Sequence, residues 1–240
     1  MKIDAQNKDF KELNAQIRSA TDQRITIVNC NGQRYIGNGL GKKVIEINGV
    51  PGNALGSYLD GCDIIVSGNA QDATGDTMND GTIVIYGSAG DATGYAMRGG
   101  KIYVRGSTGY RAGIHMKAYQ DKVPVLIVGE TAGSFLGEYQ AGGIIIVLGL
   151  HTEEKVPVGN FCGTGMHGGK IYLRCEELPQ DLPPQVVAAK ATSKDMTAIR
   201  PFLEEFCKLF NENIEYVYLK SFYVLTPNTK NPYQQLYTRN

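Results

Sequence analysis

The middle of the chain repeats a glycine-rich template, and this repeat limits the folds that the chain can adopt. The stretch from Gly87 to Gly106 reads GSAGDATGYAMRGGKIYVRG, and the stretch before it, from Gly68 to Gly87, reads GNAQDATGDTMNDGTIVIYG. The tetrapeptide Asp-Ala-Thr-Gly at 72–75 returns at 91–94. Self-similarity at a fixed period of this length is typical of stacked structural units that bury their apolar faces only against one another.

A short apolar segment precedes each of the glycines at 68, 87, 106, 129 and 149. The position four residues before the glycine is always a β-branched aliphatic residue, and a last unit continues the column: Ile64, Ile83, Ile102, Val125, Ile145 and Ile171. The position two residues before it behaves alike, with Val66, Ile85, Val104, Ile127 and Val147. Because side chains alternate between the two faces of a strand, this pattern predicts a mainly β fold, a single-stranded parallel β-helix of about six coils whose core is built from these columns.

Glycines in such a fold belong at corners, because a glycine inside a strand is destabilising. Glycine pairs and Asp-Gly dipeptides recur in one register and predict corners with positive φ at Gly81, Gly100, Gly143 and Gly169. Methionines stand at or just before these corners, and we expect them to fill the core at the bend: Met78, Met97, Met116 and Met166. The column between the two core columns is also apolar, which indicates that the outer face of the strands is covered.

The composition and the residues after Met1 argue against several classes of partner and site. Lys plus Arg equals Asp plus Glu at 24 each, and no polybasic run indicates a nucleic-acid or membrane partner. The five cysteines are widely spaced and form no C-x-x-C pair, so neither a disulfide framework nor a metal or iron–sulfur site is indicated. The residues after Met1 lack the apolar stretch of a signal peptide, and no apolar run is long enough to span a bilayer. We therefore expect a cytoplasmic protein with reduced thiols.

The two ends of the chain differ from the repeats. Residues 1–23 predict a capping helix, in which Phe10, Leu13 and Ile17 share one face. Residues 24–175 are expected to form the β-helix. Residues 176–240 are expected to hold a proline-rich linker, a second amphipathic helix that also acts as a cap, and an aromatic-rich tail that lies against the body of the protein or a partner.

Several motifs have both a chemical and a structural interpretation. The pattern Gly-x-x-Gly-x-x-x-Gly at 87–94 and 106–113 resembles a dinucleotide-binding loop, but its tandem repetition without a following helix favours turns. Asp72 and Asp91 occupy equivalent positions in adjacent coils; we interpret them as turn-capping residues, with a calcium site as the alternative. His115 is the best single candidate for an acid–base role, and no residue is assigned as catalytic, cofactor-binding or metal-binding.

Basic residues gather on two of the predicted coils: Arg98, Lys101, Arg105, Arg111 and Lys117. A solvated face is one interpretation of them. A docking patch for an acidic partner surface is the other.

These coils resemble the C-terminal glycine-repeat domain of the glutamate synthase large subunit. The resemblance runs from about Lys43 to Arg174 and is carried by the template GDATGYAMRGGKIYVRG and by the later blocks GETAGSFLGEYQAGGIIIVLG and GTGMHGGKIYLR. The flanks fit a free-standing version of that domain, and the tail segment FYVLTP at 222–227 is similar to that of such stand-alone chains. One of the subunits of formylmethanofuran dehydrogenase shares the repeat.

The resemblance implies a right-handed β-helix and a non-catalytic scaffold subunit in the synthesis of glutamate from glutamine and 2-oxoglutarate. It implies glutamine amidotransferase and FMN-dependent synthase subunits as partners, with the FMN and iron–sulfur clusters on those partners and none on this chain. A structural subunit of a formylmethanofuran dehydrogenase-like complex is the alternative, and a free-standing β-helix enzyme is a further one. Self-association is left open.

Overall fold

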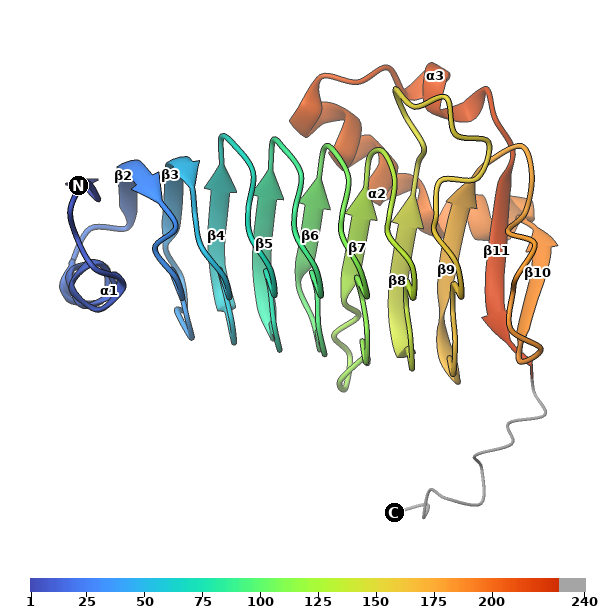
Figure 1. The fold of residues 1–240 in the computed structure, drawn as a ribbon, viewed down its shortest axis with the longest axis horizontal. Helices are drawn as coiled ribbons and strands as arrows, with labels where there is room; N and C mark the ends of the chain where they lie inside the picture. The colour runs from blue at the N-terminus through green and yellow to red at the C-terminus, as the bar shows by residue number, and fades with distance from the viewer. Residues whose placement is uncertain (229–240) are drawn as a thin grey trace, which may run out of the picture.

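The computed structural model describes residues 1–228 and has a mainly β fold in which eleven strands form one sheet (Figure 1). The strands are β1 (Lys2–Asp4), β2 (Arg24–Asn31), β3 (Val44–Val50), β4 (Asp60–Val66), β5 (Asp80–Ile85), β6 (Lys101–Val104), β7 (Val125–Val128), β8 (Ala141–Val147), β9 (Gly168–Arg174), β10 (Val186–Lys190) and β11 (Phe222–Pro227). The helices are α1 (Phe10–Ser19), α2 (Ser193–Phe210) and α3 (Ile214–Tyr218). No helix among the described residues has the length and apolar character that crossing a membrane requires.

The first nine strands lie side by side in sequence order, and each is parallel to the one before it. The antiparallel strand β11 pairs with β9, and β10 pairs with β11 at the edge. The sheet therefore has two free ends, at β1 and β10, and does not close on itself.

The core columns follow from this register. Facing residues on successive strands form an unbroken, fully buried aliphatic column: Ile45, Ile64, Ile83, Ile102, Leu126, Ile145 and Ile171. A second column lies two residues further along each strand and contains Ile47, Val66, Ile85, Val104, Val128, Val147 and Leu173. Burying one such side chain stabilises the fold by about 1.5–3 kcal/mol, so the columns form one continuous core.

Strand β7 differs from the sequence prediction by one residue. Val125 pairs with Lys101 and Ile144 and faces outward, and Leu126 takes the predicted place of Val125 in the core column. The reason is that Gly129 is not equivalent to the earlier boundary glycines, because its N–H bonds to Val104 and Glu130 follows it opposite Gly106. Since strand side chains alternate, a shift of one residue exchanges the two faces.

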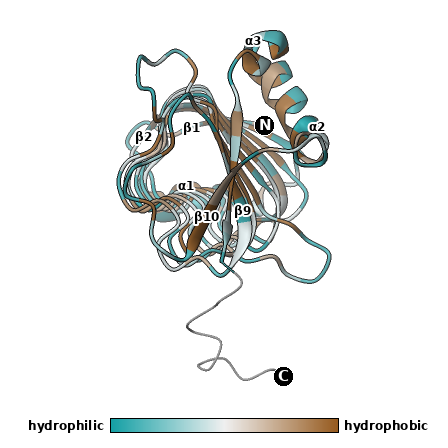
Figure 2. Ribbon diagram, turned by 90° about the vertical axis from the view of Figure 1, so that its right-hand side faces the viewer, coloured by the Kyte–Doolittle hydropathy of each residue, from teal (hydrophilic) through white to brown (hydrophobic). Residues whose placement is uncertain are grey.

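The segments that return from one strand to the next also stack. Single parallel bridges join Ala70, Ala89, Thr108, Ala132 and Val158 in turn. In the view along the stack, the return segments overlie one another on the side of the core opposite the sheet (Figure 2). The interior between sheet and return segments is filled by the core side chains.

Each return segment contains a turn in which three alternate residues are left-handed. In the turn before β4 they are Ala54, Gly56 and Tyr58, with φ values of 63°, 65° and 55°. The outer two donate their N–H groups to the next turn, and the central glycine donates to the preceding one. The central position is glycine in every copy: Gly37, Gly56, Gly75, Gly94, Gly113, Gly137 and Gly163. At Gly56 a side chain lacks room as well, because a Cβ would lie 2.7 Å from Cδ1 of Ile83 in the core.

The four glycines predicted at corners all have positive φ, between 74° and 101°: Gly81, Gly100, Gly143 and Gly169. The corner methionines are buried in the same core as the aliphatic columns. Gly81, Gly143 and Gly169 lie among the first residues of β5, β8 and β9, and Gly100 directly precedes β6, so these glycines stand where the strands begin.

Helix α2 does not cap the end of the repeat, as the sequence predicted, but covers the outer face of the sheet over its later strands (Figure 1). Its apolar face buries Ile199, Leu203, Phe206 and Phe210 against an outer column of Val84, Tyr103, Ile127, Ile146 and Tyr172. The same column is polar at Thr26 and Glu46 on the early strands, which α2 does not cover. The apolar outer column therefore reflects a helix supplied by the end of the same chain.

The ends of the chain contribute strands as well as helices. β1 extends the sheet before α1, whose Leu13 and Ile17 are buried against the first turns. The tail segment FYVLTP forms β11, so it lies against the body of the protein. Residues 229–240, including the tail aromatics Tyr233 and Tyr237, lie outside the described part of the chain.

We predict that Gly56→Ala lowers the free energy of unfolding by about 2–4 kcal/mol, because it adds backbone strain and a clash with Ile83. Gly39→Ala is the matched control, because Gly39 has φ 61° but no atom within 4 Å of the added Cβ, so only strain of about 1–2 kcal/mol is expected. Equilibrium denaturation measures both. Equal losses would contradict the packing role given to the central glycine.

Candidate docking surfaces

Exposed aromatic rings line the turns that lead into the later strands. We call Tyr95, Tyr110, His115, Phe135, Tyr139 and Phe161 the aromatic ridge. In one row, the ring of His115 meets Tyr95 edge-on at 5.9 Å between centroids and stacks on Tyr139 at 5.2 Å. In the second row, the centroids of Tyr110 and Phe135 lie 5.7 Å apart, and those of Phe135 and Phe161 lie 5.0 Å apart. Equivalent residues of neighbouring turns stack because the turns are packed at strand spacing.

Arg111 connects the two rows. Its Nε donates to Glu138, which precedes Tyr139, at 2.8 Å, and its guanidinium lies 5.1 Å from the centroid of the Phe135 ring. Such cation–π contacts are attractive and hold both groups in place. The ridge is therefore an ordered surface rather than a set of independent side chains.

The ridge places bulky residues where the backbone favours glycine. Arg111, His115, Phe135, Tyr139 and Phe161 all have left-handed φ, between 53° and 61°. The equivalent positions of the two preceding turns hold small residues, Ala73, Thr77, Ala92 and Ala96, whereas Tyr35 and Tyr58 stand at such positions in the first two turns. A left-handed residue other than glycine costs roughly 1–2 kcal/mol. Burial in the core does not offset this cost for Tyr139 and Phe161, because these side chains are 42% and 47% exposed.

The second surface is the outer face of the sheet. Two nearly identical segments of the sheet hold α2 against it. The segment KIYVR at 101–105 covers β6 and the residue after it, and KIYLR at 170–174 lies on β9. Lys101 and Tyr103 both bond to Glu205 of α2, at 2.7 and 2.6 Å. Lys170 and Tyr172 both approach Asp195 of α2, at 2.7 and 3.5 Å.

The arginines that end the two copies hold the segment after α2. Arg105 lies 3.7 Å from Glu212. The fully buried Arg174 donates to the carbonyls of Val217, Leu148 and Tyr216 at 2.7–3.0 Å. Its guanidinium thus keeps hydrogen-bond partners although it has left water. The two copies together fix α2 and α3 against the sheet.

Electrostatics strengthen this attachment. Hydrogen bonds from Lys170 and then Thr192 hold the pKa of Asp195 well below its ordinary value of 3.8. Burial acts to raise the pKa of Glu205, but hydrogen bonds from Lys101 and Tyr103 outweigh it and keep that pKa below its ordinary 4.5. Burial, followed by the bond to Glu205, raises the pKa of Tyr103, so its hydroxyl stays a donor.

The five predicted patch residues are divided between two sides of the molecule. Lys101 and Arg105 bind carboxylates of the C-terminal segment on the outer face of the sheet. Arg111 belongs to the ridge. Arg98 and Lys117 occupy equivalent positions in neighbouring turns, because the N–H of Arg98 bonds to Met78 and that of Lys117 to Met97. Neither pairs with a carboxylate within the described residues, although the Arg98 guanidinium lies 5.8 Å from the centroid of the Tyr119 ring.

The sequence also raised two aspartates, one histidine and the cysteines as candidates for a chemical role, and the structure shows what surrounds each of them. Asp72 accepts the N–H of Asp91 at 2.9 Å, and Asp91 accepts that of Tyr110 at 2.7 Å, so both carboxylates cap the following turn. His115 is exposed between two tyrosine rings of the ridge. All five cysteines are buried free thiols, and burial raises the pKa of Cys162 to about 12.

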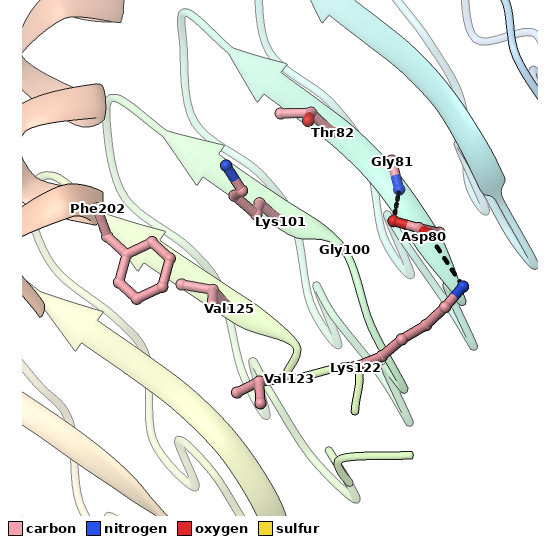
Figure 3. Close-up of a pocket in the computed structure, with 9 residues that line it drawn as sticks. All are labelled: Asp80, Gly81, Thr82, Gly100, Lys101, Lys122, Val123, Val125 and Phe202. Carbon is pink, nitrogen blue, oxygen red and sulfur yellow. Dashed lines mark hydrogen bonds and ion pairs between the residues drawn. The ribbon is translucent and has the colours of Figure 1, made fainter. Parts of the chain in front are cut away.

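A shallow cavity of about 280 Å³ lies beside α2 and is lined partly by Lys122, Asp80, Val125 and Phe202 (Figure 3). Lys122 bonds to Asp80 at 2.9 Å and lies 3.7 Å from Asp60, while Phe202 and Val125 form the apolar side. Ligand pockets usually begin near roughly 300 Å³. Its charged groups are paired within the chain, so it offers less for recognition than the ridge does.

The sequence pattern had not revealed the ridge. The glycine after each strand brings the strands of successive repeats into register, but it does not bring the turns into register. Alignment on the central turn glycine shows alanine or threonine two residues before and after Gly75 and Gly94, and arginine, histidine or aromatics at the same positions around Gly113 and Gly137. That change along the repeat is the signal that identifies the ridge.

Comparison with known proteins adds the family. The family described by the GXGXG motif matches residues 4–231. The chain belongs to the GXGXG motif family. The left-handed residues of each turn have the spacing of that motif, although here only the central glycine is kept in every copy.

One relative and one solved structure are similar to this member of the family. Uncharacterized protein MJ1350 of Methanocaldococcus jannaschii is 48% identical over 250 residues, which cover 98% of this chain and 95% of that protein. A chain of the formyltransferase/hydrolase complex from Methylorubrum extorquens, solved in complex with methylofuran, has a similar fold, with a TM-score of 0.62 and 18% identity. That match covers 91% of this chain and 88% of the other.

We predict that α2 loosens from the sheet as the pH falls from 7 to below about 4. Asp195 and Glu205 have depressed pKa values in the folded state, so their stabilisation is present above their ordinary pKa values and is lost as the carboxylates are protonated. Hydrogen–deuterium exchange should show α2 opening before β6. The double variant Asp195→Asn, Glu205→Gln should open at neutral pH and lose most of the pH dependence; an unchanged profile would contradict the role of the two carboxylates.

Proposed function

We propose that this chain is a non-catalytic scaffold subunit of a multi-subunit complex that resembles glutamate synthase. In this role it holds a glutamine amidotransferase and an FMN-dependent synthase together in the cytoplasm, and the FMN and iron–sulfur clusters lie on those partners. The observation that carries the proposal is the family match, which extends from β1 through β11 and so accounts for nearly the whole described fold.

The geometry suits a scaffold. We interpret the stacked turns as a right-handed, single-stranded parallel β-helix, supported by the hydrogen bonds that join successive return segments. In such a stack each turn is fixed by both neighbours, so the surface is rigid along its length. A rigid surface loses little conformational entropy when partners bind.

A formylmethanofuran dehydrogenase-like complex is the second candidate. It is favoured by the similar fold of a chain in the formyltransferase/hydrolase complex. The two candidates differ in their partners, so the proteins that accompany the chain distinguish them.

Reconstitution tests the leading proposal. We expect glutamine-dependent glutamate formation by purified amidotransferase and synthase subunits to require this chain, while ammonia-dependent formation by the synthase subunit does not, because only the former needs both parts held together. Activity is measured as glutamate formed from 2-oxoglutarate with each nitrogen donor.

The variant Arg174→Met removes the guanidinium that binds two carbonyls of α3. It tests whether the outer face contributes to assembly. Full glutamine-dependent activity without the chain, and no complex by size-exclusion chromatography, would contradict the proposal. Recovery of the tagged chain with formylmethanofuran dehydrogenase subunits would favour the second candidate.

A further inference from the structure

The aromatic ridge has the composition of a binding surface rather than of a folding element. Most of its rings are exposed, and four of them stand at left-handed positions that the two preceding turns fill with alanine or threonine. Tyrosine and arginine dominate the energetics of protein–protein interfaces, because they combine a large apolar area with few rotatable bonds or with planar donors. The side of the molecule opposite α2 therefore carries an ordered group of such residues.

The charges beside the ridge indicate the sign of its partner. Arg98 and Lys117 follow Ala96 and His115 by two residues, so both cations flank the row that contains His115 and Tyr139. Both are exposed, and within residues 1–228 neither has a carboxylate partner. Complementary charge on a partner would satisfy them and speed association.

The shape of the ridge indicates an extended partner. Its members come from four successive turns, which at strand spacing span roughly 14 Å along the stack, the length of about four residues of extended peptide. A twofold contact with a second copy across this surface would bring Arg98 and Lys117 near the same residues of the other copy. Like charges that close are unfavourable.

We propose that the aromatic ridge, with Arg98 and Lys117, binds an extended acidic segment of a partner polypeptide. The proposal names the chemistry of one partner contact and rests on the scaffold role proposed above. Apolar side chains of the segment lie between the rings of the two rows, and its carboxylates pair with Arg98 and Lys117.

Glycine variants test the ridge without endangering the fold. The triple variant His115→Gly, Phe135→Gly, Tyr139→Gly removes three rings at positions whose φ values suit glycine. The matched control is Ala73→Gly, Thr77→Gly, Ala96→Gly, which makes the same backbone change in earlier turns and removes no ring. A third variant, Arg98→Gln, Lys117→Gln, removes only the charges. Circular dichroism and thermal unfolding verify that all three fold.

The probe is a fluorescein-labelled synthetic peptide in which glutamate alternates with leucine, and its binding to the full chain is followed by fluorescence anisotropy. We expect saturable binding by the wild type and the control variant, and at least about tenfold weaker binding by the ridge variant. The charge variant should bind weakly and with little dependence on salt. The corresponding glutamine–leucine peptide should bind the wild type weakly and with little dependence on salt, as the acidic peptide binds the charge variant.

Three results would overturn the inference: no saturable binding by the wild type, equal binding by the ridge and control variants, or stronger binding of the uncharged peptide. Sedimentation velocity adds a fourth, because conversion of a dimer into a monomer by the ridge variant would assign the surface to a second copy. Failure of the reconstitution described above, together with ridge-dependent peptide binding, would remove the scaffold role and leave the ridge as an acidic-peptide site.

Discussion

The structure depends on the packing of aliphatic side chains into columns that run from strand to strand. Ile64, Ile83 and Ile102 each contact their equivalents before and after, so no turn buries its apolar residues by itself. The left-handed turns follow from this requirement, because the chain must return across a narrow core and still donate hydrogen bonds to both neighbouring turns. The central glycine meets both conditions: it accepts the positive φ, and it leaves room for an isoleucine of the core column.

This arrangement produces two side surfaces, which differ in whether another described part of the chain covers them. The chain covers the apolar outer face of the later strands with its own helix α2, which the paired KIY segments hold through Glu205 and Asp195. The turn side has no such cover among the described residues. There the outer positions of the turn change from alanine and threonine around Gly75 and Gly94 to arginine, histidine and aromatics around Gly113 and Gly137. A rigid stack with one face closed and the other carrying ordered rings is suited to holding other proteins in fixed positions.

Much of the fold could be predicted from the sequence, because period, corner glycines and core columns are local consequences of the repeat. The exception on β7 has a simple cause: a longer connection shifts Gly129 by one position, and a shift of one residue exchanges Val125 with Leu126. The place of α2 could not be predicted, because Lys101 and Glu205 are about a hundred residues apart and no local pattern joins them. The ridge was missed for another reason, since exposed side chains at left-handed positions follow no hydrophobic period.

The most direct test of the central claim is hydroxyl-radical footprinting of the chain, free and within the assembly that a tagged copy recovers from its own cells. If the turn side is the docking face, Tyr95, Tyr110 and Tyr139 become protected in the assembly. Tyr58, which is 53% exposed on an earlier turn outside the ridge, stays reactive and serves as the internal standard. Equal reactivity of the three ridge tyrosines in both states, or recovery of the chain without any partner, would contradict the account.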